Sequence, residues 1–238
     1  QKFDLIIDLQ SKLRNTLILR KIPHVNFYSS TLNFYFCSKK NNYVKNPDIV
    51  LTTINNLNLL LSENIKITRF NFDTIPSQFI NEAKRLLPNN NYIGFSVTQG
   101  NVYRKKSWSL NNFISLANKL EAINKIPVFF IDRDNTNLLK KIKHSVPKAI
   151  FPEKDTSHSS PVLVTALSKR LDKAISIDNG VMHMISLANV PMIVLFGPTN
   201  SDKFSPKISN IKVFDSKKIY GTSDINKITV QEIFDSIK

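Results

Sequence analysis

The sequence predicts an α/β fold in which short apolar strands alternate with amphipathic helices. From residue 92 onward, short apolar runs alternate with segments whose apolar residues recur at helical spacing. Strands that are apolar on both faces are typical of a parallel sheet covered by helices on both sides. We therefore expect a Rossmann-like parallel sheet, in which ligands bind beyond the carboxyl ends of the strands.

The elements of this regular region follow one another in strict alternation. Ser109 is placed to cap the first helix, since its hydroxyl can accept from a free backbone N–H. The expected strands cover residues 92–97, 128–131, 149–151, 174–177 and 192–196. The expected helices cover residues 110–122, 136–143, 161–170 and 181–189. Each helix is then a crossover between two parallel strands.

The N-terminal part of the sequence is less regular. Residues 3–8 form an apolar run that ends in an acid, as a buried strand would, and we expect further sequence upstream of them. Apolar spacing predicts helices over residues 13–19, 48–62 and 76–87. Residues 23–46, rich in Asn, Ser, Lys and aromatic side chains, give no clear element.

The asparagine cluster at 89–91 is the best candidate for a domain boundary. It separates a partial N-terminal domain, residues 1–88, from a C-terminal domain, residues 89–238, that contains the regular pattern. A last helix is expected at about 228–237.

Composition limits the class of partner. Lys and Arg number 33 against 18 Asp and Glu, a formal charge of +15. This charge favours an anionic partner, which could be nucleic acid, a phosphorylated small molecule or an acidic membrane surface.

Cys37 is the single cysteine, which excludes an internal disulfide and a cysteine-based zinc site. His24, His144 and His158 lack ligand spacing, so no metal is expected. No apolar run approaches the roughly 20 residues that span a bilayer, and we expect a cytoplasmic protein.

The most specific chemical pattern follows the strand expected at 174–177. Asp178 or Asn179 can cap the next helix, and Gly180 allows close approach of a ligand to the backbone. The free N–H groups and the helix dipole would suit a diphosphate, and His183 lies in the first turn, able to donate to an oxygen. A turn that uses these residues for capping alone, with a structural histidine, is the alternative.

Two further segments follow neighbouring strands. Gly197 and Pro198 form a tight turn after residues 192–196, and Thr199 offers a hydroxyl at the same edge, although an ordinary Gly-Pro turn would look alike. Residues 98–106 begin with Thr98 and end with the cations Arg104, Lys105 and Lys106, which would attract a polyphosphate unless the loop is merely solvated. The single tryptophan, Trp108, is expected to anchor this loop.

In this order, the motifs resemble glycosyltransferase family 9, the ADP-heptose:lipopolysaccharide heptosyltransferases. The family's D-[TS]-G-x-x-H helix is matched by residues 178–183, an alanine-to-proline segment by 188–191, F-G-P-T by 196–199 and K-x-W by 106–108. Residues 3–10 look like the family's "DLVIDLQG" strand, with Ser11 where glycine is usual.

The resemblance implies a GT-B architecture of two Rossmann-like domains, with the donor bound in the C-terminal one and the acceptor in the N-terminal one. It implies inverting, metal-independent transfer of a sugar, heptose from ADP-heptose, to a lipopolysaccharide-core or related glycan acceptor, without a cofactor. Lys106 would be catalytic by neutralising diphosphate charge. The implied donor-binding residues are Thr98, Lys106, Asp178, Asn179, Gly180, His183, Gly197 and Thr199. The last helix would pack back toward the first domain.

Three departures from the family pattern stand out. The family's catalytic base, an Asp beside a Gly, would precede this chain, so we expect the 238 residues alone to be inactive. Asn179 replaces the usual Thr or Ser. Asp132 and Asp134 stand where the family often has a donor-contacting Glu.

Two other functions are also compatible with the sequence. The charge also fits a basic module that binds RNA or an anionic membrane, although no RNA-binding motif appears and no nucleic acid is expected. Peripheral contact with the anionic inner membrane is compatible with the transferase function as well. The third possibility is an incomplete transferase that binds a nucleotide sugar without turnover.

Overall fold

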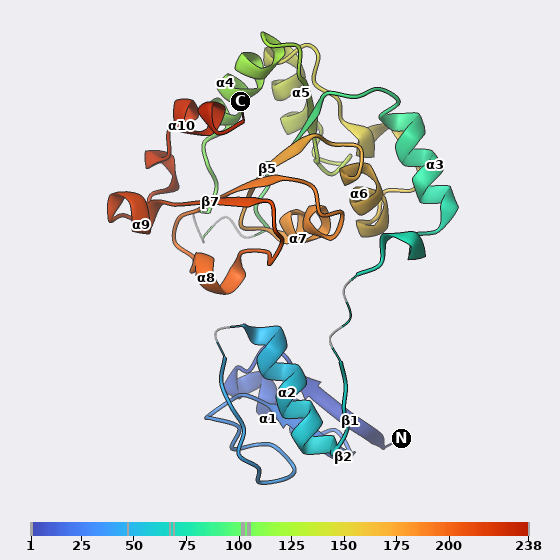
Figure 1. The fold of residues 1–238 in the computed structure, drawn as a ribbon, viewed down its shortest axis with the longest axis vertical. Helices are drawn as coiled ribbons and strands as arrows, with labels where there is room; N and C mark the ends of the chain where they lie inside the picture. The colour runs from blue at the N-terminus through green and yellow to red at the C-terminus, as the bar shows by residue number, and fades with distance from the viewer. Residues whose placement is uncertain are drawn as a thin grey trace. The chain divides into compact units, whose positions relative to one another are not determined.

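The computed structural model describes residues 2–46, 48–66, 68, 70–100, 103 and 106–237. The chain divides into two compact units, Gln1–Arg69 and Phe70–Lys238 (Figure 1). The expected boundary at 88/89 therefore falls inside the second unit. The reason is that helix α3 (Ser77–Leu86) packs on helix α6 (Pro161–Ser168) of that unit.

The second unit is built on a five-stranded parallel sheet with the strand order β4-β3-β5-β6-β7. Its core strands are buried on both faces, as their apolar composition predicts. The strands are β3 (Tyr92–Ser96), β4 (Ile126–Phe129), β5 (Lys173–Ile177), β6 (Met192–Phe196) and β7 (Ile211–Asp215). The parallel α/β fold expected from the sequence is confirmed.

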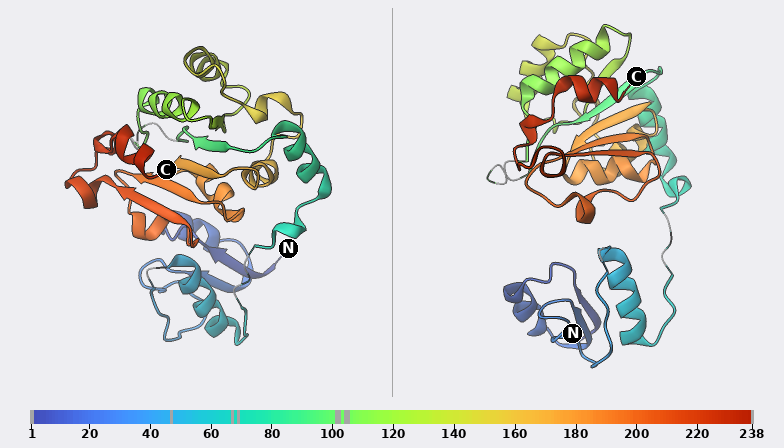
Figure 2. Two further views of the ribbon diagram at one scale, coloured as in Figure 1. Left: turned by 45° about the horizontal axis from the view of Figure 1, so that its top comes forward. Right: turned by 60° about the vertical axis from the view of Figure 1, so that its left-hand side comes forward.

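Helices cover both faces of this sheet (Figure 2). One face packs against α4 (Leu110–Glu121), α5 (Thr136–Ser145) and α10 (Val230–Asp235). The other face packs against α3, α6 and α7 (Gly180–Leu187). Alternate residues of each strand enter the two cores, as the two-residue period of a strand requires. The described part of this unit also contains η1 (Phe72–Thr74), η3 (Pro152–Asp155), α8 (Ser201–Phe204), α9 (Ser216–Tyr220) and η4 (Ile225–Lys227).

Two of the expected strands differ from the observed ones. Strand β4 begins and ends two residues before the expected 128–131, although Phe130 and Ile131 are buried beyond its end. The strand expected at 149–151 is reduced to a bridge between Val128 and Ile150. Strand β7 gave no signal, because Lys212 and Val213 are exposed and the apolar pattern is broken.

The first unit contains a smaller parallel pair of strands, β1 (Phe3–Asp8) and β2 (His24–Ser29). Helices α1 (Leu13–Arg20) and α2 (Ile49–Leu61) pack against these strands. Asp8 is buried at the end of β1, where its carboxylate accepts from the hydroxyls of Thr16 (2.6 Å) and Ser29 (3.0 Å). These bonds satisfy the buried charge and join α1 to both strands.

The turn after β2 has an unusual backbone. Leu32, Asn33 and Phe34 have φ angles of 46°, 55° and 65°, all in the left-handed region. Such a conformation costs about 1–2 kcal/mol for a residue with a side chain. Burial of Phe34 against Tyr28 and Tyr43, with ring centroids 6.2 and 5.2 Å away, offsets part of this strain.

Cys37 is buried in the small core of this unit, as a cysteine used for packing would be. In the part of the chain that the structure describes, no helix is long and apolar enough to cross a membrane.

Trp108 anchors the loop before α4, as expected. It is fully buried, its Nε1–H donates to the carbonyl of Ile228 at 2.9 Å, and its ring meets Phe113 at 5.0 Å. We predict that Trp108→Phe lowers the free energy of unfolding by about 1–3 kcal/mol, because the Ile228 carbonyl loses its donor inside the core. Urea unfolding followed by circular dichroism measures this, and an unchanged midpoint would contradict the anchoring role.

Candidate nucleotide-sugar site

The sheet has a topological switch point between β3 and β5. From β3 the chain runs to β4 on one side, and then returns to β5 on the other side. The loops after β3 and β5 therefore diverge and leave a crevice at the carboxyl edge, which is where α/β sheets bind ligands. Thr98 follows β3, and Asp178, Asn179 and Gly180 follow β5, so the sequence placed them at the right edge.

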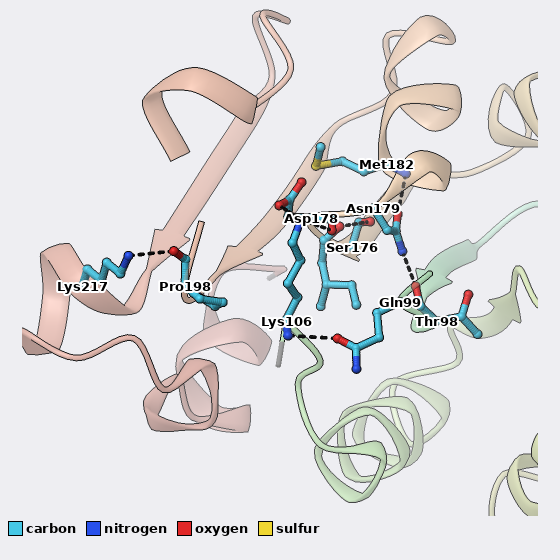
Figure 3. A network of polar contacts seen from close by, with 10 residues as sticks. Thr98, Gln99, Lys106, Ser176, Asp178, Asn179, Met182, Pro198 and Lys217 are labelled. Carbon is cyan, nitrogen blue, oxygen red and sulfur yellow. Dashed lines mark hydrogen bonds and ion pairs between the residues drawn. The ribbon is translucent and has the colours of Figure 1, made fainter. Parts of the chain in front are cut away.

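The side chain of Asn179 connects the two walls of this crevice. Its Oδ1 accepts from the backbone N–H of Met182 at 2.9 Å and caps α7 (Figure 3). Its Nδ2 donates to the Ser96 hydroxyl at 2.7 Å and to the Thr98 carbonyl at 2.8 Å. The predicted cap is confirmed. A Thr or Ser could supply the cap, but neither could also donate both bonds to the loop after β3.

Lys106 pairs with Asp178 at the end of β5. The two side chains are 13% and 8% exposed, and the ammonium also lies 3.5 Å from the Asp178 carbonyl. The backbone N–H of Lys106 donates to Gln99 Oε1 at 2.9 Å (Figure 3). A solvated loop lysine is thus the wrong description of Lys106. Arg104 and Lys105, the other two cations of the loop, lie outside the described residues.

The N-terminus of α7 faces open space. A Cβ built on Gly180 would meet no atom within 4 Å among the described residues outside its own helix turn, so a ligand has room to approach the backbone here. His183, in the first turn, has a pKa below its usual value, because burial disfavours its charged form and Lys106 repels it, while Asp178 acts in the opposite direction. The imidazole is therefore neutral near pH 7 and can donate one hydrogen bond and accept another.

The turn after β6 requires glycine for a packing reason that the sequence does not show. A Cβ on Gly197 would lie 2.8 Å from the Ser223 carbonyl oxygen and 3.0 Å from Ile225 Cβ, so glycine is required for packing of this segment. The Pro198 carbonyl accepts from Lys217 Nζ at 2.7 Å. Thr199 Oγ1 is buried and has no hydrogen-bond partner among the described residues.

A carboxylate that the sequence analysis missed lies near the end of β4. Glu153, on η3, has a pKa raised first by burial and then by Asp132, and it accepts from the Ser159 hydroxyl at 3.0 Å. The bridge at Ile150 brings η3 to the same sheet edge as Asp132. The short apolar run at residues 149–151 could have indicated Glu153, because a residue that follows a parallel strand lies near the carboxyl edge of the sheet.

No group of three or more His, Cys, Asp or Glu side chains that could hold a metal ion occurs among residues 2–46, 48–66, 68, 70–100, 103 and 106–237. The crevice instead offers a lysine, a helix N-terminus and a neutral histidine. These groups bind anions and hydroxyl groups.

A parallel sheet with a cation and a helix N-terminus at its switch point is the arrangement in which α/β domains bind phosphate-bearing ligands. The sequence model of glycosyltransferase family 9 (heptosyltransferase) matches residues 1–232. The chain therefore belongs to this family, and sugar transfer is its class of reaction.

Solved structures share the fold. Escherichia coli heptosyltransferase WaaC with ADP is 16% identical, with a TM-score of 0.72, over all of this chain and 72% of that one. The family 9 glycosyltransferase of Veillonella parvula is 18% identical, with a TM-score of 0.73, over all of this chain and 73% of that one. E. coli ADP-heptose lipopolysaccharide heptosyltransferase II is 15% identical, with a TM-score of 0.66, over 98% and 74%. The GT-B-like fold class is confirmed by these likenesses. No curated protein sequence matches the chain.

The connecting role of Asn179 can be separated from its capping role. Asn179→Ser keeps an acceptor for the Met182 N–H but removes both bonds to Ser96 and Thr98, so we expect a loss of about 1–3 kcal/mol in unfolding free energy. Asn135→Ser is the matched control, because Asn135 caps α5 through Leu138 and makes no further side-chain hydrogen bond in the described part of the chain. Equal losses in urea unfolding would refute the connection.

The two glycines of the site should respond oppositely to alanine. Gly197→Ala forces a Cβ onto the Ser223 carbonyl, and we expect a loss of about 1–3 kcal/mol in unfolding free energy. Gly180→Ala meets open space and should leave the stability unchanged or slightly raised. Thermal unfolding of both variants measures the difference. A stable Gly197→Ala protein would return Gly197 to a ligand-facing role.

Proposed function

We propose that this chain binds ADP-heptose in the crevice between β3 and β5 and serves inverting, metal-independent transfer of the heptose. The acceptor is a lipopolysaccharide-core or related glycan. The observation that carries the proposal is the buried Lys106–Asp178 pair beside the open N-terminus of α7. WaaC, which has the same fold, has been solved with ADP and with ADP-2-deoxy-2-fluoro heptose, and this supports the choice of donor.

In this proposal the diphosphate lies against the first N–H groups of α7. Lys106 has three N–H donors, of which the carboxylate and the backbone carbonyl of Asp178 use two, so one remains for a phosphate oxygen. Negative charge grows on the leaving diphosphate as the glycosidic bond breaks, and a lysine already fixed by Asp178 stabilises it without reorganising. Neutral His183 and Thr199 Oγ1 complete the polar lining.

Other groups have supporting roles. Asn179 uses both N–H groups of its amide and one acceptor site of its oxygen within the protein, so we assign it to shaping the crevice rather than to holding the donor. Asp132 and Glu153 are the candidates to accept from ribose hydroxyls, as carboxylates do at the corresponding edge of dinucleotide-binding sheets. Inversion also needs a base that deprotonates the acceptor hydroxyl, and none of these residues has that role. We propose that the protein works in the cytoplasm, with peripheral contact to an anionic membrane.

Removing the lysine should weaken diphosphate binding. We predict that Lys106→Ala lowers ADP affinity by about 1.5–3 kcal/mol, the value of a charge-assisted hydrogen bond. Because the change leaves Asp178 buried and unpaired, Lys106→Ala/Asp178→Asn is measured beside it to separate lost binding from lost folding. Calorimetry gives the affinity, and Lys141→Ala on the exposed face of α5 is the charge-matched control. Unchanged ADP affinity in both lysine-106 variants would contradict the proposal.

Gly180→Val distinguishes a specific crevice from a basic surface. The valine side chain enters the space where the diphosphate would lie and removes no charge, and its Cβ meets no atom of another described segment within 4 Å. ADP binding should disappear, whereas any association of single-stranded RNA should persist and fall steeply with salt. If RNA outcompetes ADP at moderate salt, or if the variant keeps ADP binding, the site is not a nucleotide-sugar crevice.

A further inference from the structure

The second unit contains a cavity of about 400 Å³ between helix α5 and residues 149–155. This volume lies within the roughly 300–1,000 Å³ of small-molecule sites. The residues that form the walls of the donor crevice, among them Lys106, Asp178 and Gly180, do not line it. It is therefore a second cavity of this unit.

One side of α5 forms the first wall of the cavity. The wall consists of Thr136, Leu139, Lys140 and Lys143, which recur at the i, i+3, i+4 and i+7 spacing of a single helix face. The second wall is the segment whose residue Ile150 bridges to Val128 of strand β4. Both walls thus belong to elements that the sheet holds in place.

The buried part of the lining is apolar. It consists of Leu139, Ala149 and Phe151, together with the half-buried Ile150. Leu139, Ala149 and Phe151 are members of the core between α5 and the sheet, and Leu139 and Phe151 each keep 7% of their surface exposed. An apolar group in the cavity would extend this core and remove its remaining apolar surface from water.

The exposed part of the lining is basic. The cations that line the cavity are Arg133, Lys140, Lys143 and Lys154. Lys143 Nζ donates to the carbonyls of Pro147 at 2.8 Å and Ala149 at 3.0 Å, and these bonds fix its ammonium at the wall. The side chains of the other three make no hydrogen bond or ion pair with another described residue. Their charges are therefore free to meet an anion.

Asp155 is the one acid among the described residues of the lining. A cation from outside the cavity lies beside it, since Arg85 Nη2 donates to the Asp155 carbonyl at 2.8 Å. The lining itself contributes four positive charges against this single negative one. A ligand anion at the mouth of the cavity thus meets net attraction.

We propose that this cavity binds an anionic amphiphile, an alkyl or acyl chain that ends in a phosphate or a carboxylate. The chain lies against Leu139, Ile150 and Phe151, and the anionic end lies among the lysines and Arg133. A free amphiphile and a phospholipid of an anionic membrane share this chemistry. Amphiphile binding goes beyond sugar transfer and does not depend on the donor crevice.

A single-stranded nucleic acid fits this lining less well. Its bases bind proteins by stacking on exposed aromatic rings. Phe151 is the one aromatic residue among the described lining residues, and at 7% exposure it offers no open ring face. A polyanion would meet the cations and leave the apolar wall unused, whereas an amphiphile uses both.

The test uses the full 238-residue chain with octyl phosphate, 1-octanol and inorganic phosphate as probes, each below the concentration at which micelles form. Binding is followed by chemical-shift titration of methyl groups. We expect octyl phosphate to bind more tightly than either other probe and to shift the methyl resonances of Leu139 and Ile150. Saturating ADP should leave this binding unchanged.

Equal affinity for octyl phosphate and inorganic phosphate would show that the apolar wall is not used, and would overturn the proposal. Displacement of octyl phosphate by ADP would overturn it as well, because the probe would then occupy the donor crevice. A chain that binds octyl phosphate but not ADP would refute the donor site alone.

Lys140→Gln/Lys154→Gln, compared with Lys141→Gln/Lys148→Gln, tests the charge. Each pair removes two positive charges from exposed lysines of the same region, but only the first pair lines the cavity. The first pair should weaken octyl phosphate about tenfold, as expected for the loss of two exposed charge contacts, and the second should leave its affinity unchanged. Equal losses would mean that the overall charge attracts the probe, and the proposal would fail.

Vesicles of phosphatidylcholine, with and without phosphatidylglycerol, distinguish the two sources of the amphiphile. Co-sedimentation with the anionic vesicles that Lys140→Gln/Lys154→Gln abolishes, and the control pair does not, assigns the cavity to a membrane lipid. Binding of octyl phosphate without co-sedimentation assigns it to a free amphiphile. A uridine oligonucleotide that binds more tightly than octyl phosphate and displaces it would overturn the proposal in favour of a nucleic-acid surface.

Discussion

The ion pair between Lys106 and Asp178 is the contact on which the shape and electrostatics of the crevice depend. It joins the loop after β3 to the end of β5, across the switch point of the sheet. Both partners are largely withdrawn from water, and moving charges out of water costs several kcal/mol per ion. Well-packed apolar residues would stabilise such a position better. The presence of charges in this place is therefore better explained by what they do to a ligand than by what they do for the fold.

Asn179 makes this arrangement rigid. Its three hydrogen bonds fix the start of α7, the end of β3 and the backbone of Thr98 relative to one another. Lys106 then meets Asp178 from a loop whose base is held by Gln99 on one side and by buried Trp108 on the other. A cation held in this way needs no reordering when an anion arrives, which is the condition for electrostatic stabilisation of a developing charge. Substituting asparagine for the family's Thr or Ser has thus added a connection between the walls.

The sequence predicted the buried strands and the helices that cover them, because an apolar run between turn residues is stable only when it is buried in the core. Strand β6 and the start of α7 are examples. Strand β7 was missed because it lies at the sheet edge and exposes Lys212. Strand β2 was missed because its residues are partly polar and form a strand by pairing with β1.

The edge of the sheet at which the site lies followed from strand direction alone. The Lys106–Asp178 pair did not, since its partners are 72 residues apart and no local pattern connects them. Gly197 is the opposite case. A sequence motif identified it, but the reason why glycine is needed there is its close packing against Ser223 and Ile225.

The positive charge of the chain and the neutral balance inside the crevice have different consequences. The formal charge of +15 creates a long-range field that attracts any anion, including RNA and acidic membranes, and that salt screens within about 10 Å. Within the crevice, Asp178 compensates Lys106 and His183 is neutral near pH 7, so the described side chains there carry little net charge. Discrimination must then come from directed donors, namely the N–H groups of α7 and the remaining N–H of Lys106. A diffuse polyanion gains from the field but cannot satisfy those directions, whereas a compact diphosphate gains from both. The overall charge thus raises the rate of encounter, and the crevice decides which anion stays.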